Sequence, residues 1–204
     1  ASTPGINDKE YEDERPVEGR AAREYRSHAM RVGFLAQDSP RLQRQAKELA
    51  RGMSCPTVGA QRRLKRVARF LRNRPRHVQS FSMQEAPGKF DIFTDSEWAG
   101  DAVERKSTSS THLLHGSHLL RSSSSTQSVI ALSVGEAEFY AFVKGCCAAI
   151  GAKSMARDLG WHLSLMISTD SSAAKGIAAR RGAGKIRHIH TPPLCGCSGR
   201  SMRR

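Results

Sequence analysis

The chain has 204 residues and a formal net charge of +14, which suits one full domain plus a smaller one and favours a polyanionic partner. It has no run of roughly 20 apolar residues that would span a membrane, and its start shows no signal-peptide pattern. Its cysteines are 5 in number and Cys146 and Cys147 are adjacent, which argues against a disulfide framework. We therefore expect an intracellular protein of the cytoplasm or nucleus, not bound to a membrane, that binds nucleic acid through its phosphates.

Residues 1–20 are rich in acidic, Pro and Gly residues and poor in apolar ones. This composition predicts a disordered acidic lead-in, because such a segment cannot bury enough apolar surface to offset its ordering entropy. The acidic residues are Asp8, Glu10, Glu12, Asp13, Glu14 and Glu18.

Residues 21–80 are predicted to be helical. Ser39 followed by Pro40 indicates a helix start, and Pro56 followed by Thr57 indicates a break and a second start. The first helix carries apolar residues at helical spacing: Leu42, Ala46, Leu49, Ala50 and Met53. The second is expected to bury Leu64, Val67, Ala68 and Leu71. Basic residues on the other faces could form an ordinary solvated surface or a phosphate-binding one.

Residues 88–190 show a different pattern. Short apolar or β-prone runs come first and helical periodicity follows, which predicts a mixed sheet with flanking helices, an α/β fold. The expected strands span about 90–94, 111–114, 117–122, 163–169 and 185–190, with an extended piece at 129–132. The expected helices span about 134–159 and 171–181.

Two of the expected strands end in the same way, in Thr-Asp-Ser, and deliver Asp95 and Asp170 at their carboxyl ends. A helix between them contains Glu136 and Glu138. Ser133 and Glu136 form a capping-box pattern, so Glu138 is the residue left free to face the strand ends. Taken singly, each Asp could simply cap a turn or a helix. Taken together, the three carboxylates are what a divalent-metal phosphodiester site needs.

Several of these stretches resemble one known family. Residues 94–109 resemble the "DADWAGD…RKSTSG" stretch of Copia-type retrotransposon polyproteins. Residues 124–141 are similar to their "SSKKQ..VALS..EAEY.A" stretch, residues 170–174 to "DNQSAI" and residues 185–189 to "RTKHI". Residues 25–71 resemble the end of the Copia reverse transcriptase, "YRS…PT…KRILRYL".

The resemblance implies a ribonuclease H-like domain across 88–190, behind a reverse-transcriptase remnant across 21–80. Such domains hydrolyse the RNA strand of RNA–DNA hybrids with Mg²⁺, or Mn²⁺, held by four carboxylates. Carried over by motif, Asp95, Glu138 and Asp170 would be the catalytic metal ligands. The basic residues expected to contact nucleic acid are Arg62, Arg63, Lys65, Arg66, Arg69, Arg105 and Lys106.

One departure concerns the fourth carboxylate. The family pattern continues "KHID", whereas His190 stands here in place of the Asp, and no acidic residue follows Asp170. An imidazole suits softer ions than Mg²⁺ and brings no negative charge. Residues 191–204 have no helical periodicity and are expected to be an irregular tail, either a frameshifted or a truncated terminus. We therefore predict weakened cleavage. Two alternatives stay open, a catalytically dead basic nucleic-acid-binding remnant and a fragment without a stable fold.

Overall fold

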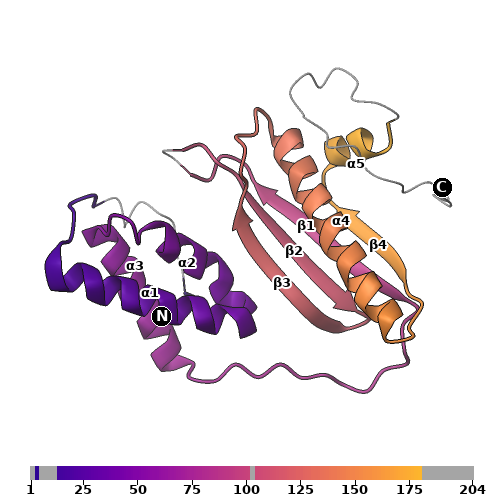
Figure 1. Cartoon of the computed structure of the whole chain (residues 1–204), viewed down its shortest axis with the longest axis horizontal. Coiled ribbons are helices and arrows are strands. Elements are labelled where there is room, and N and C mark those ends of the chain that lie inside the picture. Colours follow the sequence, from indigo (N-terminus) through magenta and orange to yellow (C-terminus); the bar gives the residue numbers. More distant parts are fainter. Residues whose placement is uncertain (1–2, 5–12, 102–103, 181–204) are drawn as a thin grey trace.

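Three helices precede a four-stranded sheet in the computed structural model, which describes residues 3–4, 13–101 and 104–180 (Figure 1). The helices are α1 (Gly19–Asp38), α2 (Pro40–Arg51) and α3 (Val58–Asn73), and we call them the helical module. Within the described residues, no helix has the length and apolarity needed to cross a membrane.

Two helix starts lie where the sequence predicts them. Pro40 is the first residue of α2, and the Thr57 hydroxyl accepts a hydrogen bond from Ala60 N at 3.2 Å at the start of α3. The predicted buried stripe of α3 is partly wrong, because the helix turns Val67 and Phe70 inward and leaves Ala68 exposed. Tertiary packing explains the difference, because Phe70 is a larger apolar side chain than Ala68 and packs into the core that α3 shares with α1 and α2.

The predicted disordered lead-in extends too far. Residues 13–18 pair with the segment before α3, where Val17 N donates to Pro56 O at 2.8 Å and Val58 N donates to Arg15 O at 3.0 Å. These backbone hydrogen bonds fix the chain in place before α1 begins at Gly19. Residues 1–2 and 5–12 of this prediction lie outside the described residues.

The sheet is mixed and has the order β3-β2-β1-β4. Strands β1 (Lys89–Glu97), β2 (Thr108–His115) and β3 (His118–Thr126) are antiparallel neighbours, and β4 (Ser164–Thr169) pairs with β1 in parallel. Helix α4 (Val134–Asp158) crosses one face of the sheet, and α5 (Ser172–Ala178) follows β4 (Figure 1). The predicted α/β class is therefore confirmed.

The strands differ from the prediction in length. β2 and β3 extend into runs of Ser and Thr, because the antiparallel ladder pairs Thr108 with Thr126 and the Thr111 and Ser123 hydroxyls hydrogen-bond at 2.5 Å. Residues 129–132 form no strand; Val129, Ile130 and Leu132 are exposed there. The strand predicted at 185–190 and the tail at 191–204 lie outside the described residues.

The core of the sheet lies under α4. Phe90, Ile92 and Leu113 are buried against Ala149 of the helix. Gly145 brings the helix closest to the sheet, since a Cβ at this position would collide with the Thr94 methyl. This close approach sets the height of α4 above β1.

Helix α2 joins the helical module to the sheet. Its Gln43 side chain exchanges two hydrogen bonds with Ser122, each 2.8 Å, and Lys47 Nζ donates to Thr108 Oγ1 at 2.6 Å. At the end of α2, Arg51 pairs with the buried Asp101 at 2.7 Å. The basic and polar side of α2 therefore faces the sheet rather than bulk solvent alone.

Candidate metal centre

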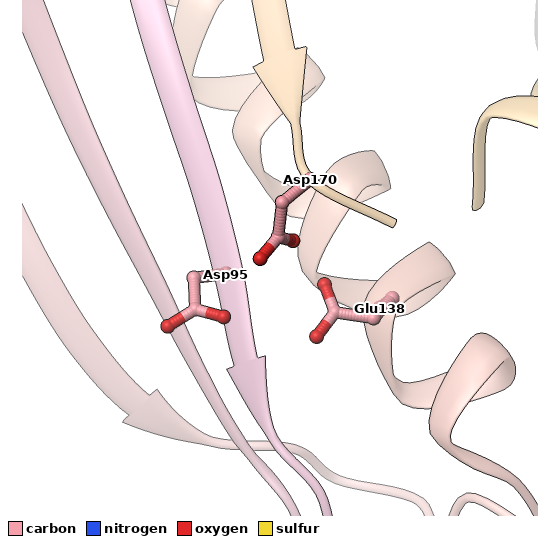
Figure 2. A group of neighbouring side chains, drawn as sticks. All are labelled: Asp95, Glu138 and Asp170. Carbon is pink, nitrogen blue, oxygen red and sulfur yellow. The ribbon is translucent and has the colours of Figure 1, made fainter. Parts of the chain in front are cut away.

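Three carboxylates meet where β1, β4 and α4 come together. Asp95, Glu138 and Asp170 each place a carboxylate oxygen within 4.8 Å of the others. Figure 2 shows the three side chains pointing toward one another from β1, from the loop after β4 and from α4. The structure thus brings together the three catalytic residues that the sequence predicts.

The parallel pairing of β1 and β4 positions the two aspartates. Thr94 lies opposite Thr169 in the register, so the next residue of each chain, Asp95 and Asp170, leaves the pair at the same level. The two Thr-Asp-Ser patterns of the sequence therefore lie side by side at the end of this strand pair. Strand β1 continues to Glu97, so Asp95 lies within the strand and caps no turn.

The start of α4 separates the roles of its two glutamates. The Ser133 hydroxyl accepts from Glu136 N at 3.2 Å, and a Glu136 oxygen accepts from Leu132 N at 2.8 Å. Glu136 is therefore used in capping, as the sequence predicts. Glu138, two residues on, points to the opposite side of the helix and reaches the strand ends.

Asp170 is also free of a capping role. The cap of α5 is Ser171, whose hydroxyl accepts from Ala174 N at 3.1 Å. Asp170 itself is exposed, so its carboxylate is available to a ligand.

Glu138 is the buried member of the group, with 6% of its surface exposed. Burial raises the pKa of its carboxyl, and the neighbouring charges of Asp95 and Asp170 raise that pKa further. Among the described residues, its Oε2 atom is buried without a hydrogen-bond partner. A divalent cation between the carboxylates would satisfy this oxygen and remove the repulsion.

Ser96 holds the other oxygen of Glu138. The Ser96 hydroxyl donates to Glu138 Oε1 at 2.7 Å, and its backbone N–H donates to the same atom at 3.2 Å. These bonds oppose the effect of burial on the Glu138 pKa. No sequence motif singles out Ser96, although strand alternation places it on the face of β1 opposite to Asp95, toward α4.

The predicted nucleic-acid-binding residues are divided between two places. Five of them lie on α3, which contacts α1 and α2 but no strand. Arg105 and Lys106 lie in the β1–β2 connection, where the Arg105 guanidinium stacks over Trp98 at 5.8 Å and Lys106 pairs with Glu104 at 2.6 Å. The five on α3 are Arg62, Arg63, Lys65, Arg66 and Arg69. Among the described residues, the backbone of α3 therefore lies away from the sheet that carries the carboxylates.

His190, predicted at the fourth ligand position, lies outside the described residues. Arg44 of α2 pairs with Glu97 at 2.7 Å and lines the same hollow as Asp95. Sequence reasoning missed its position, because nothing in the pattern of α2 distinguishes Arg44 from its basic neighbours.

Comparisons with protein-family models, with curated proteins and with solved structures find no match to this chain. The functional argument therefore depends on the site itself. The carboxylate triad could hold a metal ion. Its ligands are all oxygens, which hard divalent cations such as Mg²⁺ and Mn²⁺ prefer, and it contains no thiol or imidazole that would favour a softer ion.

Proposed function

We propose that this chain is a retroelement-derived ribonuclease H-like domain that hydrolyses the RNA strand of RNA–DNA hybrids with Mg²⁺ or Mn²⁺. The observation that carries the proposal is the convergence of Asp95, Glu138 and Asp170 on one point. The resemblance to Copia-type polyproteins supports it independently, since its motifs assign the same three residues. The net charge of +14 supports a nucleic-acid substrate.

The exposed and the buried carboxylates would have different parts in the reaction. Asp95 and Asp170 are exposed and would hold divalent ions at the surface that the substrate reaches. Glu138 is buried and oriented by Ser96, so it would fix the position of the ion nearest α4. When bound, the metal ions would activate a water and neutralise charge on the attacking and leaving oxygens of a phosphodiester.

A second candidate function is nucleic-acid binding without cleavage. His190 at the fourth ligand position favours it, because a three-carboxylate site carries less negative charge toward a second Mg²⁺. The two candidates share the substrate and differ only in turnover.

The test is cleavage of a 5′-labelled RNA–DNA hybrid by the full chain, first in Mg²⁺ and then in Mn²⁺. We expect slow, metal-dependent cleavage of the RNA strand, which Asp95→Asn abolishes. Asp91→Asn is the matched control, since Asp91 lies on the same face of β1 and pairs with Lys89 at 2.8 Å, outside the triad. Single-stranded RNA should stay intact.

Each outcome separates the candidates. Cleavage that Asp95→Asn removes and Asp91→Asn retains would support the ribonuclease. Hybrid binding without cleavage in either metal would favour the non-catalytic function. Cleavage that survives Asp95→Asn would refute the assignment of the site.

A further inference from the structure

Two adjoining hollows lead away from Asp95, one of the three carboxylates, between the helical module and the sheet. The first hollow, about 250 Å³, is lined by Arg44 of α2 and by Asp95, Ser110 and His112 of the sheet. The second hollow, about 780 Å³, lies between α2 and β3. Both hollows share the same lining residues where they meet: Pro40, Gln43, Ser122, Ser123 and Ser124. At this junction Gln43 and Ser122 are hydrogen-bonded to each other. We call the two adjoining hollows together the α2 groove.

The floor of the α2 groove is the sheet face that α4 leaves open. In the strand register Asp95 lies opposite Ser110, and Ser110 lies opposite Ser124. Directly opposed residues share a face, whereas Ile92 and Leu113 point to the other face, under α4. The floor therefore presents hydroxyl groups in a row that leads away from Asp95. Three strands at about 4.8 Å spacing give this row a length of about 10 Å, which is enough for a few nucleotides.

The wall of the groove supplies the positive charge. Arg44 is 57% exposed, and its guanidinium reaches across the groove to Glu97, two residues after Asp95. An ion pair this exposed contributes little stability, so its guanidinium can exchange one anionic partner for another at low cost. A guanidinium that is held beside a metal centre and can be released is suited to bind a phosphate bidentately.

We propose that the α2 groove binds the backbone of the nucleic-acid strand next to the scissile phosphate, with Arg44 transferring from Glu97 to a phosphate as the strand enters. This inference rests on the proposed function, because it assumes a nucleic-acid substrate at the triad. It replaces α3 by α2 as the principal phosphate-binding surface of the helical module. The strand's sugar and phosphate oxygens would accept hydrogen bonds from the serine hydroxyls of the floor.

The experiment measures binding of a fluorescent RNA–DNA hybrid to the full chain by anisotropy, in Ca²⁺ to prevent turnover, over a range of salt concentrations. Arg44→Gln should weaken binding about tenfold. It should also make the plot of log binding constant against log salt concentration less steep by about one unit, which corresponds to the loss of one phosphate contact. Arg23→Gln is the matched control. Arg23 is an exposed residue of α1 that does not line the groove, and its loss removes the same charge.

Glu97→Gln separates phosphate binding from a structural role of the ion pair. If Arg44 binds phosphate, removing its competing partner should leave binding unchanged or tighten it. If the pair only fastens α2 to β1, Glu97→Gln and Arg44→Gln should weaken binding equally, and that result would overturn the inference. A thermal melt of each variant checks that it is folded.

Two further outcomes are decisive. Hybrid binding by the wild type that Arg44→Gln and Arg23→Gln reduce equally would overturn the role of the groove and leave the proposed function intact. A wild-type chain that neither binds nor cleaves the hybrid would overturn both.

Discussion

Ser96→Ala tests how the site orients its buried carboxylate. The substitution removes the 2.7 Å hydrogen bond from the hydroxyl to Glu138 Oε1 and leaves only the longer backbone bond of 3.2 Å. A hydrogen bond to a charged group contributes about 1.5–3 kcal/mol. Loss of such a partner behind a metal ligand commonly costs about 10- to 100-fold in metal affinity. We expect the affinity for Mn²⁺ to fall within that range.

The pKa of Glu138 adds to this loss. The hydroxyl lowers that pKa against the effect of burial, so its removal raises the pKa further. Protons then compete better with the metal, and the defect of Ser96→Ala should grow as the pH falls.

The assay is titration of the apo protein with Mn²⁺, in which the signal of free Mn²⁺ is followed by electron paramagnetic resonance. Ser96→Thr keeps the hydroxyl and should restore most of the affinity. Ser164→Ala, at the opposite end of the sheet on β4, is the control for removing a serine hydroxyl. Mn²⁺ binding by Ser96→Ala as tight as that of the wild type would show that the backbone N–H alone positions Glu138, and our reasoning would be wrong.

Three further predictions concern stability. The folded-state pKa of Glu138 lies above its ordinary value of 4.5, so the folded chain loses stability as the pH rises from that value through the raised pKa. Glu138→Gln should therefore raise the melting temperature of the metal-free protein at pH 7 but not below about pH 4. A lower melting temperature at pH 7 would contradict this reasoning. Gly145→Ala should lower the free energy of unfolding, measured in urea, by about 1–3 kcal/mol, because the added methyl would meet Thr94. Gly151→Ala in the same helix meets open space and should raise the free energy of unfolding by about 0.5–1 kcal/mol. Equal effects of the two substitutions would refute the close packing of α4 on the sheet. Thr57→Ala should cost about 1 kcal/mol in the same assay through loss of the cap of α3, and an unchanged unfolding midpoint would show that the cap contributes nothing.

Local chemistry explains what the sequence predicted well. Pro40 and Thr57 mark helix starts through their own backbone and side-chain constraints, and Ser133 with Glu136 forms a cap from residues three apart. Each of these signals depends on a few consecutive residues. The extended piece expected at 129–132 forms no strand for the same reason: the apolar run has the right local character, but no strand among the described residues pairs with it.

The sequence by itself determined the identity of the three carboxylates. Thr-Asp-Ser recurs at two strand ends, which identifies the two aspartates, and Glu136 caps its helix, which leaves Glu138 as the third carboxylate. Only the tertiary structure decided how they meet: the register of β1 with β4 aligns the two aspartates, and the contact of Gly145 with Thr94 sets α4 at the height where Glu138 reaches them. The structure alone also placed Ser96 behind Glu138 and Arg44 beside Asp95. Such pairings join residues far apart in the chain, 42 positions for Ser96 and Glu138 and 74 for Thr94 and Ser168, and no local pattern in the chain encodes the packing that brings them together.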